Sequence, residues 1–375
     1  MTRMIRRFAW AFAALPLAAT PLLGQISLPS DNTAYGTTSA EFLLLGAGAR
    51  GTALGGAYAA LATDVSALYY NPAGVAQLQR PGAMVSSYSY VADTKYTWAG
   101  VALPTGGGAR TFGLQVGSFG FSDQPEYTVE QPDGTGATYA VSETFIGATY
   151  AENFSDRFSA GFTGKIISDK LGHTSASAFA VDFGTSFHAT AAGRPIRASF
   201  VIQNLGSTLK HTGTALDVGV LRPPVPGQVD VPQEKQPADF QTKDWGLPVN
   251  FRVGVALDAV SMEQTRVTVL SEFTQPNNTR AGFGIGAEVM QSDVGKTGFF
   301  VAGRASYEYQ SDNNLDVGNG AGFATSLSSK ENADGLAAGF GVGYKKGDFG
   351  LGVDYAYRSM GILQGTHMFS FSLSW

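Results

Sequence analysis

The feature that most constrains the fold is a period-two alternation of residue types from about residue 82 to the C-terminus. For example, Phe179, Val181 and Phe183 alternate with small or acidic residues. A period of two is the pattern of β-strands whose two faces meet different surroundings. We count fourteen such segments, near 84–92, 95–103, 110–120, 138–151, 156–168, 175–189, 194–205, 248–259, 265–273, 279–290, 297–309, 334–345, 348–358 and 365–375.

Alternation alone leaves two all-β architectures open. A soluble sandwich buries its greasy faces, whereas a membrane barrel presents them to lipid. Segments of roughly 9 to 13 residues suit a tilted crossing of the hydrocarbon layer. The polar faces are filled by glycine and serine, and only 15% of the residues are charged. We therefore predict a 14-stranded antiparallel transmembrane β-barrel over residues 82–375, with its apolar face outside.

The N-terminus predicts export to a Gram-negative-type cell outer membrane. Three arginines within the first seven residues precede an apolar run at 8–23, which is the pattern of a secretory signal peptide over residues 1–24. Cleavage after residue 19 or after residue 24 fits equally well. A retained membrane anchor is disfavoured because two prolines interrupt the short run. The formal net charge of −5 becomes more negative once the signal is removed, so nucleic acid is not an expected partner.

The last strand resembles the C-terminal strand that barrel-assembly machinery recognises. Phe371, Leu373 and Trp375 share one face, opposite serines, and the chain stops on the aromatic residue. The expected partners are therefore this machinery and outer-membrane lipid. The alternative is a plain edge strand with an aromatic end.

The long connections predict the orientation of the barrel. The third, seventh and eleventh connections, at about 121–137, 206–247 and 310–333, are long, and the even ones are short. Transmembrane barrels place long loops outside and short turns in the periplasm. The 206–247 connection carries five prolines. It is either a lid or docking surface over the outer mouth or a loop without a role.

Residues 40–80 lack the alternation and predict a plug inside the barrel, as part of a segment 25–81. Asp64 is a good N-cap for a helix at 65–70. Asn71-Pro72 ends that helix and begins another, because the residue before proline avoids the α region. Arg50 and Asp64 are the only charged residues between positions 41 and 80. Two short helices that meet at a kink are expected, enclosed in the lumen.

This segment also resembles a known family. The runs FLLLGAGAR at 42–50 and GGAYAALATDVSALYYNPAG at 55–74 are similar to the N-terminal signature of the PorV/PorQ family of bacterial outer-membrane proteins. LPVNFRVGVALD at 247–258 also looks like a strand of that family. PorV/PorQ proteins are themselves similar to FadL-type channels for hydrophobic compounds, which share the Asn-Pro-Ala element.

The resemblance implies a non-enzymatic barrel with one of two tasks. The first is a shuttle in type IX secretion, which binds C-terminal domains of secreted proteins. The alternative is a FadL-like channel in which the plug gates the uptake of a hydrophobic small molecule. The plug or gate residues would be Arg50, Asp64, Asn71, Pro72, Ala73 and Gly74. A general porin is disfavoured because an open aqueous pore has no need of the plug.

Charged residues on the strands predict rows of alternating sign inside the wall. Folding the chain about a turn at 259–264 sets Arg252 opposite Glu272 and Asp258 opposite Arg266, if no bulge intervenes. The next hairpin brings Arg280 near Glu272, and Glu288 near Arg266. The rows are either scaffolding or a polar track for ligand or plug. Contact with Arg50 or Asp64 would favour the track.

The chain shows no sign of catalytic or metal chemistry. It contains no cysteine, and its four histidines lack metal-ligand spacing. His188 and Asp182 share a strand face but lie roughly 20 Å apart, too far for a catalytic pair. Its glycine-rich strings are strand patterns without a phosphate loop's spacing. We therefore expect no cofactor and no enzymatic activity.

Overall fold

A computed structural model describes residues 36–221, 235–310, 335–360 and 364–375 of the chain. Four sequence predictions fall partly or wholly outside these residues. They are the signal peptide at 1–24, the start of the plug segment at 25–35, the middle of the 206–247 connection, and nearly all of the 310–333 connection.

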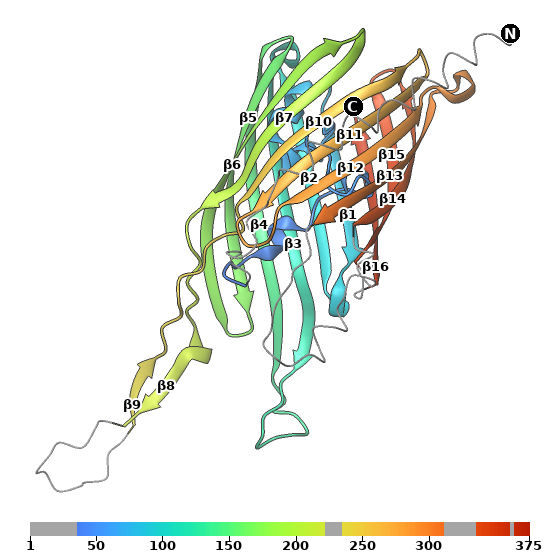
Figure 1. The fold of residues 1–375 in the computed structure, drawn as a ribbon. Coiled ribbons are helices and arrows are strands. Elements are labelled where there is room, and N and C mark those ends of the chain that lie inside the picture. The colour runs from blue at the N-terminus through green and yellow to red at the C-terminus, as the bar shows by residue number, and fades with distance from the viewer. Residues whose placement is uncertain (1–35, 222–234, 311–334, 361–363) are drawn as a thin grey trace, which may run out of the picture. The chain divides into compact units, whose positions relative to one another are not determined.

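The strands form a closed antiparallel barrel of fourteen, as the alternation predicted (Figure 1). The order is β1-β16-β15-β14-β13-β12-β11-β10-β7-β6-β5-β4-β3-β2. Strand lengths exceed the predicted segments in several places. The barrel strands are β1 (Gly82–Ser89), β2 (Lys95–Thr105), β3 (Arg110–Pro125), β4 (Thr138–Ser155), β5 (Phe158–Leu171), β6 (Thr174–Ala191), β7 (Arg194–Gly206), β10 (Asn250–Ser261), β11 (Thr265–Pro276), β12 (Gly282–Gln291), β13 (Phe299–Gln310), β14 (Leu336–Lys346), β15 (Phe349–Ser359) and β16 (Gly365–Ser374).

The apolar face of the barrel points outward. Phe179 is 62% exposed, whereas its chain neighbours Ala178 and Ala180 are 7% and 1% exposed. The same contrast recurs around the barrel, where phenylalanine, leucine and valine alternate with buried small residues. A soluble sandwich would bury these side chains. A continuous apolar outer belt of this extent fits a lipid surface.

The C-terminal strand closes the barrel and is not an edge strand. β16 pairs with β15 on one side and with β1 on the other. The side chains of Phe371, Leu373 and Trp375 lie exposed on the outer face. The amide of Trp375 donates to the carbonyl of Pro81 at 3.1 Å, so both ends of the barrel chain lie at one rim.

The described part of the plug, from residue 36, contains four short helices and lies inside the ring of strands (Figure 1, blue). They are η1 (Glu41–Leu44), α2 (Ala49–Ala53), α3 (Ala67–Tyr70) and η2 (Pro72–Gln77). The kink at Asn71-Pro72 lies where the sequence predicted it, with Asn71 extended and its side chain accepting from the amide of Ala73.

The predicted helix start was wrong by two residues. α3 begins at Ala67, because the preceding turn is of the tighter 3₁₀ type, in which the amide of Ala67 donates to the carbonyl of Asp64 at 3.0 Å. The carboxylate of Asp64 accepts from the amide of Ser66 at 2.9 Å. Asp64 therefore stabilises this turn instead of capping the α-helix.

The remaining short elements lie in the connections. The turns contain η3 (Val91–Asp93), η4 (Gly106–Gly108), η5 (Thr214–Leu216) and η6 (Val294–Lys296). In the described ranges, no helix is long and apolar enough to cross a membrane. The 206–247 connection contains a two-stranded hairpin that the sequence did not predict, formed by β8 (Asp217–Val220) and β9 (Gln236–Asp239). Figure 1 shows its strands extending away from β6 and β7.

Candidate functional site

The plug packs against glycines of the barrel wall, which explains why the inner faces are small. A Cβ atom added at Gly184 on β6 would lie 2.2 Å from Oδ1 of Asn71. One added at Gly161 on β5 would lie 2.4 Å from the carbonyl carbon of Pro72. Both distances are far below van der Waals contact. The inward-facing glycines of β5 and β6 therefore leave the space into which the kink of the plug packs.

Asn71 joins the two halves of the plug to the wall. Its side chain is fully buried, and its Nδ2 donates to the carbonyl of Ala59 at 3.1 Å and to that of Thr185 on β6 at 3.2 Å. Its Oδ1 accepts from the amide of Ala73 at 3.1 Å. Pro72, Ala73 and Gly74 are buried beside it. The Asn-Pro-Ala element is thus both a helix start and a wall contact.

Replacing Asn71 with alanine is expected to lower the free energy of unfolding by about 2 kcal/mol. The variant loses a helix cap and leaves two buried carbonyls without donors, each of which costs free energy. Chemical unfolding of the refolded protein in lipid measures the loss. Asn71→Asp keeps the cap but removes both donors, so it should be destabilised as well. A fully stable Asp variant would show that the wall contact contributes nothing.

A buried chain of charges crosses from the plug to the wall. Arg50 makes two hydrogen bonds of 2.8 Å to the carboxylate of Glu288 on β12, and another of 2.9 Å to Asp64. Glu288 also accepts from Arg304 on β13 at 2.8 Å, and Arg304 donates to Asp354 on β15 at 2.6 Å. We call Asp64, Arg50, Glu288, Arg304 and Asp354 the plug latch. Because positive and negative residues alternate along the plug latch, each buried charge has a partner of opposite sign that offsets the cost of removing it from water.

Asp64 is held as a carboxylate by its surroundings. Burial alone would raise the pKa of Asp64, but the charge of Arg50 and hydrogen bonds from Ser66 and Tyr58 bring that pKa below its ordinary value. The hydroxyl of Tyr58 donates to Asp64 at 2.7 Å. Arg50 also lies 5.4 Å above the ring of Tyr58. These contacts keep both plug charges paired inside the barrel.

A second ion pair, on the neighbouring strands β10 and β11, also holds the plug. Nε of Arg252 donates to Glu272 at 2.5 Å, and the same arginine donates to the carbonyl of Gly56. The second oxygen of Glu272 accepts from the amide of Ala59 at 2.8 Å. These two wall charges therefore bind the plug backbone directly. Together with the Arg50–Glu288 contact, they favour the interpretation of the charge rows as a polar track that binds the plug.

The predicted register of the charged strands was wrong by two residues. Arg252 lies opposite Thr274, and Glu272 lies opposite Gly254. The turn begins only after Ser261, and a bulge follows Asp258, so the hairpin is centred later than predicted. Arg252 and Glu272 still meet because a shift of two keeps both on the inner face.

Of the other predicted charge pairs, one was wrong and one was confirmed. Asp258 lies opposite Thr268 and forms its ion pair with Arg197 of β7, so its predicted pairing with Arg266 was wrong. Arg266 lies 3.9 Å from Glu288, as the second hairpin predicted. Arg280 precedes β12, where its carbonyl accepts from Gln310 at 2.9 Å. Gly284, not Arg280, lies opposite Glu272.

Several inward charges were not predicted. Nζ of Lys165 lies 2.6 Å from Asp182 and donates to Asn204 at 2.8 Å, fully buried between β5, β6 and β7. Arg358 pairs with Glu308 at 2.9 Å. Each of these charged residues lies at an inward position of the period-two pattern. The alternation along each strand could therefore have shown that they face the inside of the barrel. Their partners lie on strands whose register the sequence did not supply.

A cavity of about 640 Å³ opens above the plug, at the rim that carries the long connections. We call it the mouth cavity. Its floor is η1 of the plug, and aromatic side chains from β1, from β3 and from the turn after β1 form much of its wall. Its lining is Thr38, Ser39, Ala40, Glu41, Phe42, Leu44, Leu45, Thr52, Tyr88, Tyr90, Phe119, Glu143, Arg358, Ser359, Met360 and Thr366.

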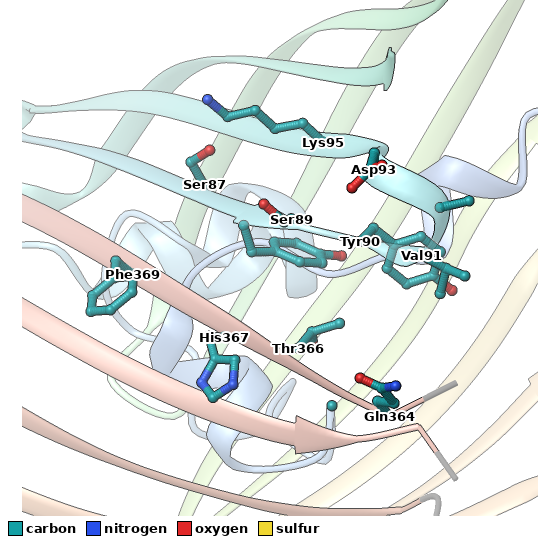
Figure 2. Close-up of a pocket in the computed structure, with 13 residues that line it drawn as sticks. Ser87, Ser89, Tyr90, Val91, Asp93, Lys95, Gln364, Thr366, His367 and Phe369 are labelled. Carbon is teal, nitrogen blue, oxygen red and sulfur yellow. The ribbon is translucent and has the colours of Figure 1, made fainter. Parts of the chain in front are cut away.

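A second cavity of about 770 Å³ lies at the seam where β1 meets β16. The register of these strands ends at the pair Ser87 and Phe369, although both strands continue beyond it. Figure 2 shows the lining of this seam cavity, in which Ser89, Tyr90 and Lys95 from the β1–β2 hairpin stand across from Thr366 and His367 of β16. The wall is therefore not continuously hydrogen-bonded at this seam.

The two cavities adjoin each other. Tyr88, Tyr90 and Thr366 line both of them. Tyr88 is buried, its hydroxyl donates to the carbonyl of Leu45 at 3.1 Å, and its ring lies 6.2 Å from that of Tyr90. This tyrosine pair therefore lies between the mouth cavity and the seam cavity.

Comparison with known proteins identifies the fold. No known family profile matches the chain, and no curated protein matches it. The toluene transporter TodX of Pseudomonas putida gives a TM-score of 0.51 at 10% identity, covering 92% of this chain and 99% of that chain. The toluene transporter TbuX of Ralstonia pickettii gives 0.51 at 11% identity, covering 89% and 98%. At these identities the likeness is one of fold, and this chain, a closed barrel of fourteen strands, shares the fold of these transporters.

Proposed function

We propose that the protein is a non-enzymatic outer-membrane channel that takes small apolar solutes from outside the cell into the bilayer. A solute would enter the mouth cavity and leave through the seam between β1 and β16. The observation that carries the proposal is that the two cavities adjoin at Tyr88, Tyr90 and Thr366, above a lumen occupied by the plug.

The physical argument concerns where an apolar solute is most stable. Below the mouth cavity, the plug side chains from Ala47 to Ala76 are mostly buried against the wall. A route along the barrel axis would require the plug latch to break. A route through the seam ends in hydrocarbon, where an apolar solute is favoured over water by about 25 cal/mol per Å² of its apolar surface. The toluene transporters of the same fold support this solute class.

The proposal is tested by uptake into proteoliposomes. Vesicles that contain the protein should take up radiolabelled toluene from a carrier faster than empty vesicles. Uptake of a sugar should equal that of empty vesicles, because the plug blocks an aqueous path. Equal toluene rates with and without the protein would refute the proposal.

Replacing Tyr88 with alanine is expected to raise toluene uptake several-fold. The variant removes the ring that separates the two cavities and leaves the barrel register from Gly82 to Ser87 unchanged. Tyr139→Ala, at an exposed ring of β4 that lines neither cavity, serves as the control. Unchanged uptake in Tyr88→Ala would show that the cavities are not joined in the path.

A second candidate function is the binding of secreted proteins, as the PorV/PorQ resemblance implies. The β8–β9 hairpin and its flanks favour it, because Val220, Leu221 and Phe240 are exposed there. Co-purification in mild detergent distinguishes the two functions. A secreted protein that is retained by the full chain and lost on deletion of residues 217–239 would support this second function over the first.

A further inference from the structure

The mouth cavity contains a carboxylate that the proposed function does not use. Glu143 of β4 lines the cavity and is half-buried. Among the described residues, it has no hydrogen-bond or ion-pair partner. A half-buried carboxylate without a donor or cation is costly, and this cost requires an explanation.

The neighbour across the sheet increases this cost. Glu143 lies directly opposite Asp169 of β5, with both on the inner face. Like charges at directly opposed positions destabilise a sheet. Asp169 has partners of its own, because Nε2 of His211 lies 3.2 Å from its carboxylate and Ser39 donates to it at 3.4 Å. Glu143 receives no such compensation.

The remaining charges of the cavity do not neutralise Glu143. Arg358 is paired with Glu308 at 2.9 Å, so its charge is already compensated. Glu41 adds a second carboxylate to the lining and accepts from Thr38 and Asn278. The cavity therefore carries an excess of negative charge at one end.

The other walls of the cavity are aromatic. Phe119 pairs with Glu143 across β3 and β4, and its ring lies 6.1 Å from that of Tyr90. Tyr88 stacks edge-on against Tyr90 at 6.2 Å, and Phe42 lines the floor. Aromatic faces attract cations as well as apolar groups, and ammonium ligands are bound in this way.

We propose that the mouth cavity selects apolar molecules that carry one ammonium group, with Glu143 as the residue that binds the charge. This inference rests on the proposed function, since it assumes that the mouth cavity receives the solute. The ammonium group pairs with Glu143 and relieves its repulsion with Asp169, while the apolar part of the ligand lies against Tyr88, Tyr90 and Phe119. A volume of about 640 Å³ accommodates a molecule of this size.

The test compares four small molecules of one shape on the full chain in lipid nanodiscs. The probes are phenethylamine, phenethyl alcohol, propylbenzene and hydrocinnamate, which present a cation, a neutral donor, an apolar end and an anion. Isothermal titration should give an affinity for the amine about 10- to 100-fold above that for propylbenzene, since a hydrogen bond to a charged group contributes this much. Hydrocinnamate should bind least.

Glu143→Gln should abolish the preference for the amine and leave propylbenzene binding unchanged. Glu263→Gln, in an exposed turn at the opposite rim, alters the net charge equally and should behave as wild type. Both variants are checked for folding by their heat-modifiable gel mobility.

The outcomes separate the inference from the function on which it rests. Equal binding of the amine and propylbenzene overturns the ammonium site and leaves the apolar channel standing. Binding of none of the probes overturns both. Tighter binding of the alcohol than of the amine, or displacement of the amine by Mg²⁺ or Ca²⁺ alone, also overturns the ammonium site.

Discussion

Replacing Arg50 with methionine is expected to lower the free energy of unfolding by about 3 to 5 kcal/mol and to loosen the plug. Among the described residues, Arg50 alone contacts both Asp64 and Glu288, so its removal takes a shared cation from these two carboxylates. Breaking a buried ion pair by removing one partner costs this much because the remaining charge stays buried. Chemical unfolding in lipid measures the loss, and bilayer conductance reports whether the plug still closes the lumen.

The matched control is Arg80→Met, which removes the same charge at an exposed site. Arg80 pairs with Asp348 at 2.9 Å, where the side chains are 36% and 86% exposed. Surface ion pairs contribute less than about 1 kcal/mol. A wild-type unfolding free energy and conductance in Arg50→Met would contradict the plug latch. The barrel would then hold the plug through packing and the contacts of Arg252, Glu272 and Asn71.

Replacing Gly184 with alanine is expected to displace the plug kink. The added methyl group would lie 2.2 Å from Oδ1 of Asn71 and 2.9 Å from Cδ of Pro72, and both of these residues are buried. Overpacking of this kind costs about 1 to 3 kcal/mol, and here it also separates Asn71 from the carbonyl of Thr185. Unfolding free energy and protease cleavage within residues 40–80 are the measurements.

The control for this variant is Gly303→Ala on β13. Gly303 lies on the outer face, and a Cβ atom there meets no atom within 4 Å. The substitution should change stability by less than about 0.5 kcal/mol. If Gly184→Ala and Gly303→Ala show the same unfolding free energy and the same protease cleavage, the plug does not pack against the wall glycines.

The two predictions together bear on the route of a solute. The ion pairs anchor the plug to β10, β11 and β12, and the wall glycines contact it on β5 and β6, so moving the plug along the barrel axis must overcome both sets of contacts. A seam with unpaired strand ends requires no such displacement. Increased conductance of Arg50→Met with unchanged toluene uptake would therefore place the solute path outside the plug.

The sequence alone determined the fourteen barrel strands and the place of the kink, but not the β8–β9 hairpin. Phe179, Val181 and Phe183 alternate with small residues because period two is a local property of extended chain. The kink at Asn71-Pro72 follows equally from local backbone restrictions. The outward direction of the apolar face also followed from composition. The opposite face carries mostly glycine and serine, whereas the solvent-exposed face of a soluble sandwich would carry more charged residues.

Only the tertiary structure decided which residues meet across the barrel. The bulge after Asp258 shifts the register, so Asp258 pairs with Arg197 and not with Arg266. The partners of Arg50 depend on how the plug lies in the closed barrel, and the juxtaposition of Glu143 with Asp169 depends on the register of the β4–β5 hairpin; no single segment encodes either. Period fixes the face on which a side chain lies, but its height on the wall depends on every turn and bulge between the paired strands.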